Sequence, residues 1–170
     1  MSLKEPEENL YVEQIVNLPF TESAGLYMGK FLTAIRDEGK IIANKCPKCY
    51  RIVLPPRIVC GFCKVEIKDK PGNWVELADR GTVIDCMPID EREIDAVTGE
   101  FVGTPNPHLF IRLDGGDEWT ILAHIAEGMD AHKYQPGARV QAVWKPKKER
   151  AGKLSDIKFF RLIEEQAKGV

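Results

Sequence analysis

The chain has 170 residues, 44% of them hydrophobic and 29% charged, as expected for a folded protein with room for one domain or two small ones. A formal net charge of −2 argues against a general polyanion-binding coat, and no apolar run approaches the ~20 residues of a membrane-spanning helix. We find no secretory or lipidation signal, so we expect a cytoplasmic protein without a membrane partner.

The charge is unevenly distributed along the chain. Residues 31–75 and 133–170 carry net charges of +5 and +6, whereas residues 76–132 carry −10. The two basic parts are compatible with a local anion site, while the acidic middle opposes contact with a nucleic acid.

The first 39 residues are predicted to form an apolar arm followed by a helix. The arm spans residues 10–20, where Pro19 interrupts any helix. Apolar residues then recur at helical spacing over 22–37, with Thr21 as a candidate N-cap and Gly39 as the end. We expect the arm and the helix to form core or a partner interface.

Two Cys-x-x-Cys pairs separated by ten residues dominate residues 40–72. Each pair can form a knuckle that turns two thiolates toward one point, so the spacing predicts a zinc ribbon. With four protein ligands there is no open position for water or substrate, and the metal is expected to be structural. Tyr50 and Lys64 stand where glycine often follows the second cysteine, so each would adopt a positive φ. The predicted ligands of the single Zn²⁺ are Cys46, Cys49, Cys60 and Cys63.

Two other roles for these cysteines are open from the sequence. Two disulfides would require an oxidising compartment, which conflicts with the expected location. A redox Cys-x-x-Cys is normally a single motif within a βαβ pattern, and that pattern is absent. We therefore favour the zinc site.

From residue 73 onward the apolar period changes to two, which indicates strands. Five strands of this spacing match an OB-fold barrel, with an SH3-like barrel as the nearest alternative. The sequence thus predicts a mainly β protein: an N-terminal arm and helix over 1–39, a zinc ribbon over 40–72, and a five-stranded OB-fold domain over 73–170. The expected strands are 74–77 continuing after a break into 81–89, then 108–113, 118–124, 138–144 and 154–162.

The run KCPKCYRIVLPPRIVCGFCK, with Asn73-Trp74-Val75, Asp79–Val83 and Pro136–Val140, resembles an archaeal and bacterial family that was formerly a domain of unknown function. The resemblance covers the chain from about residue 22 onward. Family members combine an N-terminal helical segment, a rubredoxin-like zinc ribbon and a C-terminal OB-fold, and are described as acyl-CoA-associated, so the resemblance implies a ribbon of this kind here. The resemblance implies a non-catalytic accessory subunit or scaffold in lipid metabolism, which binds acyl-CoA and associates with a thiolase-like or hydroxymethylglutaryl-CoA-synthase-like enzyme.

The residues themselves do not indicate an active site. His108, His124 and His132 are separated by sixteen and eight residues, without triad or metal spacing. Cys86 lies within a predicted strand and is expected to be a small buried hydrophobe. We therefore predict that the protein is not an enzyme.

Basic side chains of the ribbon and of a late loop are the candidates for contacts with the phosphates of CoA. Arginine suits phosphate because its planar guanidinium donates two parallel hydrogen bonds. Arg57 is the first candidate, because Pro55 and Pro56 are expected to hold the preceding backbone in an extended path. For any single residue, an ordinary solvated charge is the competing interpretation. The other candidates are Lys45, Arg51, Lys147, Lys148 and Arg150.

Nucleic-acid binding is the alternative function, because zinc ribbons and OB-folds bind nucleic acids in other proteins. Phe110, Trp119 and Trp144 could stack on bases. The second and third strands of the predicted barrel, however, lie in the acidic segment, where a polyanion gains little attraction. Nucleic acid is therefore the less favoured partner.

Overall fold

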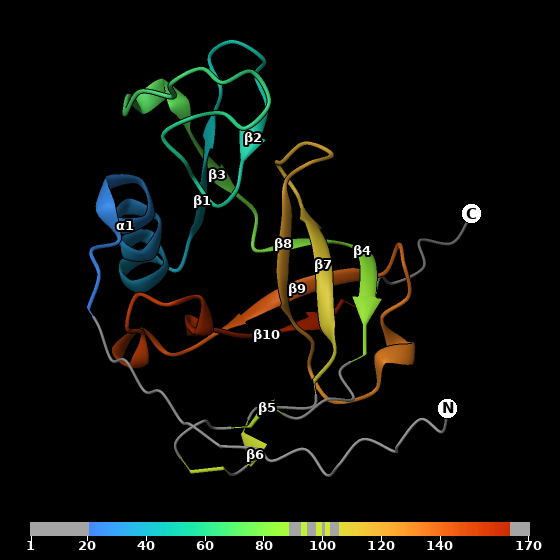
Figure 1. Cartoon of the computed structure of the whole chain (residues 1–170). Coiled ribbons are helices and arrows are strands. Elements are labelled where there is room, and N and C mark those ends of the chain that lie inside the picture. Colours follow the sequence, from blue (N-terminus) through green and yellow to red (C-terminus); the bar gives the residue numbers. More distant parts are fainter. Residues whose placement is uncertain (1–20, 89–92, 95–97, 100, 103–105, 164–170) are drawn as a thin grey trace, which may run out of the picture.

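The computed structural model describes residues 21–88, 93–94, 98–99, 101–102 and 106–163. The predicted apolar arm lies outside these residues. Figure 1 shows a small three-stranded sheet above a larger five-stranded sheet, with one helix beside the small sheet. None of the described helices is long and apolar enough to cross a membrane.

Helix α1 (Gly25–Thr33) continues into a π-helical segment, η1 (Ala34–Glu38), and ends at Gly39, whose φ is 68°. A left-handed residue after the last turn favours glycine, so the predicted end of the helix is the observed one. The start differs from the expectation. No side chain caps the helix at Ala24, and the Ser23 hydroxyl accepts a hydrogen bond from the Gly25 amide at 3.2 Å, so Thr21 is not the N-cap.

The small sheet carries the cysteine knuckles and has the order β2-β1-β3. Strand β1 (Ile41–Lys45) pairs antiparallel with β2 (Ile52–Val53) and with β3 (Trp74–Leu77), which follows the 3₁₀ turn η2 (Pro71–Asn73). Residues 74–77 were expected to begin the barrel, but they pair with β1. The ribbon sheet therefore extends past residue 72, while the division of the chain into domains stays a prediction.

The larger sheet has the order β10-β9-β4-β7-β8, and all neighbouring strands in it are antiparallel. A separate two-stranded sheet pairs β5 with β6. Short 3₁₀ turns lie in the connections that precede and follow β9. The bounds are β4 (Arg80–Met87), β5 (Glu93–Ile94), β6 (Phe101–Val102), β7 (His108–Leu113), β8 (Ile121–Ile125), η3 (Ala131–Lys133), β9 (Arg139–Trp144), η4 (Lys147–Glu149), η5 (Leu154–Asp156) and β10 (Ile157–Leu162).

The two edges of this sheet approach each other without forming a ladder between the described residues. Ala126, just after β8, makes an isolated parallel bridge with Phe160 of β10. The amide of Glu127 donates to the carbonyl of Phe160 at 2.8 Å. The prediction of a mainly β protein with a zinc ribbon is confirmed, whereas a closed five-stranded barrel is not.

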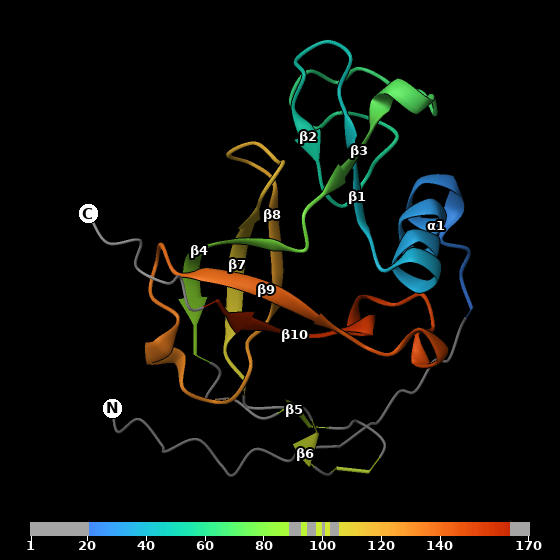
Figure 2. The ribbon, with the colours of Figure 1, turned by 180° about the vertical axis from the view of Figure 1, so that it is seen from behind.

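One apolar core joins the helix, the ribbon sheet and the larger sheet. Phe31 and Ile35 of the helical segment, Ile41 of β1 and Ile111 of β7 belong to a single buried cluster. The Tyr27 hydroxyl also donates to the carbonyl of Ile67 in the ribbon at 2.5 Å. Figure 2 shows the helix and the ribbon above the larger sheet from the opposite side. The shared core therefore fixes the position of the ribbon against the sheet.

Candidate metal centre

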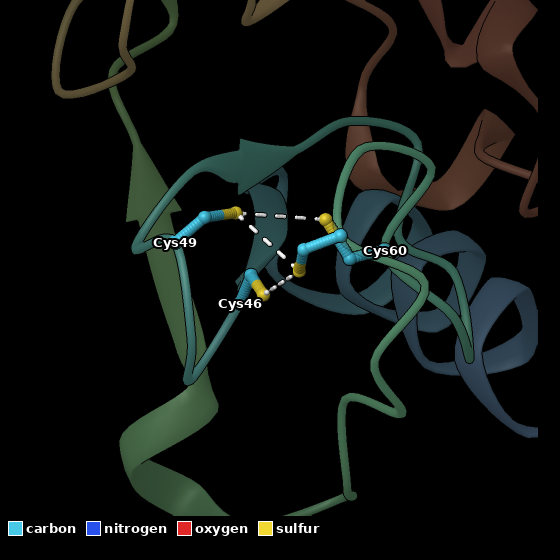
Figure 3. A group of neighbouring side chains, drawn as sticks. Cys46, Cys49 and Cys60 are labelled. Carbon is cyan, nitrogen blue, oxygen red and sulfur yellow. Dashed lines mark hydrogen bonds between the residues drawn. The ribbon is translucent and has the colours of Figure 1, made fainter.

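The four predicted ligands gather at one point of the ribbon. Their Sγ atoms all lie within 4.8 Å of one another. The closest pair, Cys46 and Cys63, is 3.3 Å apart, and the pair Cys49 and Cys60 is 3.7 Å apart. Figure 3 shows Cys46, Cys49 and Cys60 pointing toward one another.

These separations fit a tetrahedral zinc site and do not fit disulfides. A disulfide holds its sulfurs about 2.05 Å apart. Four thiolates at about 2.3 Å from Zn²⁺ have edges of about 3.8 Å, close to the observed distances. The four cysteines thus fit one structural zinc ion, as predicted, and no fifth ligand is needed to complete its coordination.

The two knuckles repeat the same local geometry. The amides of Tyr50 and Lys64 donate to the carbonyls of Cys46 and Cys60, each at 3.0 Å. Tyr50 and Lys64 have φ values of 60° and 57°, as the sequence predicted for the positions after each pair. A non-glycine residue pays a modest cost in this conformation, which the metal bonds can offset.

Backbone amides prepare two of the thiols to act as ligands. Burial raises the pKa of the Cys46 thiol, but hydrogen bonds from the amides of Cys49 and Lys48 outweigh burial and lower it to about 6. At Cys60 the same balance between burial and backbone amides lowers the pKa. Burial and the neighbouring thiols raise the pKa of Cys63 to about 11. Stabilised thiolates favour metal binding, because the thiolate is the ligand form of cysteine.

The structure does not bring the six predicted CoA contacts together. Three of them belong to the ribbon: Lys45, Arg51 and Arg57. Two others, Lys147 and Lys148, lie in η4, and this turn lies below α1 in Figure 1. The last candidate, Arg150, follows η4. The two groups therefore occupy different parts of the molecule, and the CoA contacts stay a prediction.

The backbone around Arg57 is fixed, though in another way than expected. The chain bends at Leu54 and Pro55, which are joined by a cis peptide bond, so the segment is not a simple extended path. The buried side chain of Asn44 instead holds Arg57: its amide group donates to the Arg57 carbonyl at 2.7 Å, and its oxygen accepts from the Arg57 amide at 3.3 Å. The Arg57 side chain is exposed.

The late loop over residues 145–152 is held in place by a buried carboxylate. Asp156 accepts hydrogen bonds from the amides of Ala151, Gly152 and Lys153 at 2.7 to 3.2 Å. The Arg150 guanidinium donates to the Lys145 carbonyl at 2.9 Å, so this side chain is already used within the loop.

The loop also packs tightly against the end of the helix. A Cβ at Gly39 would lie 2.6 Å from Nη1 of Arg150, the far end of a flexible side chain that can shift, so it is the positive φ of 68° that favours glycine there. Arg150 therefore serves to dock the loop on the helix.

The histidines and Cys86 lie in structural settings. The His124 Nδ1 accepts from the Ile125 amide at 2.9 Å, and Nε2 lies 3.2 Å from the Leu154 carbonyl, which acts as acceptor when Nε2 is protonated. Burial lowers the pKa of His124. Cys86 is partly buried, and its thiol lies 3.7 Å from the Ala131 carbonyl. His108 is partly buried at the start of β7, and His132 is exposed in η3.

Sequence reasoning missed two features of this region. One is a contact between Arg51, Phe62 and Trp119, which joins the ribbon to the β7–β8 hairpin. The other is an open groove of about 570 Å³ between α1 and the ribbon sheet, lined by residues that include Gly25, Gly29 and Trp74. Both depend on tertiary contacts between distant segments, so no local pattern marks them.

The fold and the four cysteines define a zinc-ribbon protein, and comparison with known families agrees. Residues 33–68 match the family model of the ChsH2 rubredoxin-like zinc ribbon domain. The ribbon of this chain therefore matches the ChsH2 zinc-ribbon family, in agreement with the family resemblance seen in the sequence. The search of curated proteins found no significant match.

Two solved structures are similar in fold. One is described as an Ltp2-ChsH2(DUF35) aldolase, with 16% sequence identity and a TM-score of 0.50 over 86% of this chain and 98% of that chain. The other is a protein of unknown function of the DUF35 family from Sulfolobus solfataricus, with 24% identity and a TM-score of 0.48 over 78% of this chain and 81% of that chain.

Proposed function

We propose that this protein is a non-catalytic accessory subunit or scaffold that associates with a thiolase-like or hydroxymethylglutaryl-CoA-synthase-like enzyme and helps to bind its acyl-CoA. The observation that carries the proposal is the ChsH2-type ribbon over residues 33–68. It is supported by the likeness in fold to the structure described as an Ltp2-ChsH2(DUF35) aldolase.

The chemistry of the described residues is consistent with a supporting role. The metal site has four protein ligands, so the ion has no position for a substrate. The buried ring of His124 is engaged by two backbone groups, and Cys86 lies against a backbone carbonyl. Catalysis in the assembly would then come from the partner enzyme.

The proposal includes an OB-type barrel for the larger sheet and the predicted division at residues 39 and 72. The barrel is supported by the approach of β8 to β10 at the bridge between Ala126 and Phe160. Amide hydrogen exchange at Glu127 as slow as that of the central strands would support closure, and fast exchange would argue for an open sheet.

The association is tested by purification of the tagged protein from its native extract, followed by size-exclusion chromatography and mass spectrometry. We expect a thiolase-like or synthase-like enzyme to co-elute in a fixed ratio. A variant that carries both Cys46→Ser and Cys60→Ser loses two zinc ligands, and it serves as the control that shows whether the association needs an intact ribbon. Recovery of RNA or ribonucleoproteins in place of such an enzyme would favour the nucleic-acid alternative.

A further inference from the structure

The exposed aromatic side chains of the described residues all belong to the ribbon and the β7–β8 hairpin. They are Tyr50, Phe62 and Trp119, which are 68%, 54% and 52% exposed. Phe62 lies in the second knuckle and Trp119 in the hairpin, yet their ring centroids are 5.6 Å apart. Large aromatic rings that gather at the surface often mark an interaction site.

Arg51 places a cation against these rings. Its guanidinium carbon lies 3.7 Å from the centroid of Phe62 and 5.4 Å from that of Trp119. Among the described residues Arg51 forms no ion pair within 4 Å. We define Tyr50, Arg51, Phe62 and Trp119 as the ribbon–hairpin surface.

The nearby carboxylate of Asp117 is already occupied by the protein. It accepts from the amide of Ile52 at 2.8 Å, from the Trp119 amide at 2.9 Å and from the Thr120 hydroxyl at 2.9 Å. Arg51 therefore keeps N–H donors for an anion supplied from outside.

The same hydrogen bonds hold the hairpin on the ribbon. Besides the contact of Asp117 with Ile52, the Thr120 hydroxyl oxygen lies 3.3 Å from the Ile52 carbonyl oxygen, although its one proton is used in the shorter bond to Asp117. The two parts are thus tied by a part-buried hydrogen bond between Asp117 and the backbone of Ile52. A surface fixed in this way loses less conformational entropy when a partner binds.

The charge and residue types point to one kind of occupant. Residues 40–72 carry a net charge of +6, and the Lys45 ammonium lies over the Tyr50 ring at 5.7 Å. Tryptophan, tyrosine and arginine are the residues most enriched at the energetic centres of protein interfaces. A complementary surface would present carboxylates around an apolar recess.

We propose that the ribbon–hairpin surface docks an acidic surface of the partner enzyme, with the carboxylate of that enzyme on Arg51 and its apolar side chains against Phe62 and Trp119. The identity of the partner rests on the proposed function. The location of the contact rests on the geometry of this chain alone.

The test measures the affinity of purified variants for the thiolase-like enzyme that co-elutes with the tagged protein. We expect Arg51→Glu and Trp119→Ala each to weaken binding by about tenfold to a hundredfold. Lys68→Glu makes a charge reversal like that of Arg51→Glu on another exposed ribbon residue, and Met129→Ala truncates an exposed side chain far from the ribbon. Both controls should bind within about twofold of wild type.

Salt provides a second readout, because an ionic contact is screened as ionic strength rises. Wild-type affinity should fall with salt, and Arg51→Glu should lose much of this dependence while Trp119→Ala keeps it. Zinc content and thermal unfolding of every variant establish that the ribbon is intact. Trp119 lies outside the ribbon, so Trp119→Ala tests the surface even if Arg51→Glu perturbs the knuckles.

The outcomes separate this inference from the proposed function. If the enzyme binds wild type and all variants equally, the ribbon–hairpin surface is not the contact, and the accessory role stands. If the enzyme does not bind wild type, both are overturned. If wild type binds a labelled 20-nucleotide RNA, and Arg51→Glu loses the RNA but not the enzyme, the surface serves nucleic acid and our inference is wrong.

Discussion

At the scale of single residues, buried polar side chains organise the backbone around the proposed functional regions. Asn44 has no exposed surface and satisfies both the amide and the carbonyl of Arg57. The buried carboxylate of Asp156 accepts hydrogen bonds from three backbone amides of the loop before β10. In both cases the hydrogen bonds of one buried side chain fix the backbone of a segment: Asn44 acts on a segment further along the chain, and Asp156 acts on its own loop.

We predict that Asp156→Asn destabilises the protein in a pH-dependent way. Burial raises the pKa of the Asp156 carboxyl, but the amides of Ala151, Lys153 and Gly152 outweigh it, so the folded-state pKa is lowered. The ionised form therefore stabilises the fold above the unfolded pKa of about 3.9, and this contribution disappears as pH falls through the lower folded value. The wild-type advantage in urea unfolding should be full at pH 7 and should shrink below about pH 4. An advantage that stays constant down to pH 3 would show that ionisation is not involved.

We predict that Arg57→Ala weakens CoA binding. Loss of a charge-assisted contact with phosphate should cost roughly 1.5–3 kcal/mol, or on the order of tenfold to a hundredfold in affinity. Calorimetric titration of CoA in the presence of the partner enzyme measures the effect. Lys158→Ala removes a like charge from an exposed position on β10 and serves as the control. Equal affinities of wild type and Arg57→Ala would place the phosphates elsewhere.

At the scale of elements, the zinc ribbon could be predicted from the sequence because its information is local. The spacing of the cysteines fixes the two knuckles, and the residue after each pair adopts a left-handed conformation whatever its type. The pairing of Trp74–Leu77 with β1 could not be predicted, because its alternating pattern suits either sheet. The contact of Arg51 with Trp119 could not be predicted either, because it depends on the position of the β7–β8 hairpin relative to the ribbon.

The ribbon should depend on its metal more than the larger sheet does. Apart from the ligands Cys46 and Cys60, the only fully buried apolar residue in its own cluster is Ile67, so the described residues provide little independent core. Metal bonds then supply much of the folding free energy. We predict one Zn²⁺ per chain by elemental analysis, and loss of the metal in Cys46→Ser.

Hydrogen exchange checks where the metal acts. After treatment with a chelator, protection should fall first over residues 46–67 and later in β4, β7 and β9. A protein that is metal-free as purified, yet shows full protection in the ribbon, would contradict the structural role of zinc.

At the scale of the whole molecule, helix, ribbon and sheet share one core, which the predicted three-part division did not anticipate. Phe31 of α1, Ile41 of β1 and Leu77 of β3 pack in the same cluster as the strands of the larger sheet. The ribbon and the β7–β8 hairpin therefore lie against each other. The acidic and basic segments noted in the sequence are brought together at this point, since Asp117 of the acidic part binds the backbone of Ile52 in the basic part.

We propose that this chain supports catalysis by a partner without catalysing a reaction itself. This is tested by the initial rate of CoA release from acetyl-CoA, from which both a condensing thiolase and a synthase release CoA, measured with the isolated chain, with the isolated partner enzyme and with the purified complex. We predict that the isolated chain releases CoA no faster than buffer, and that the complex has a lower KM than the enzyme alone. Saturable CoA release by the isolated chain, abolished by Cys86→Ala or His124→Gln in a variant that stays folded, would contradict the account.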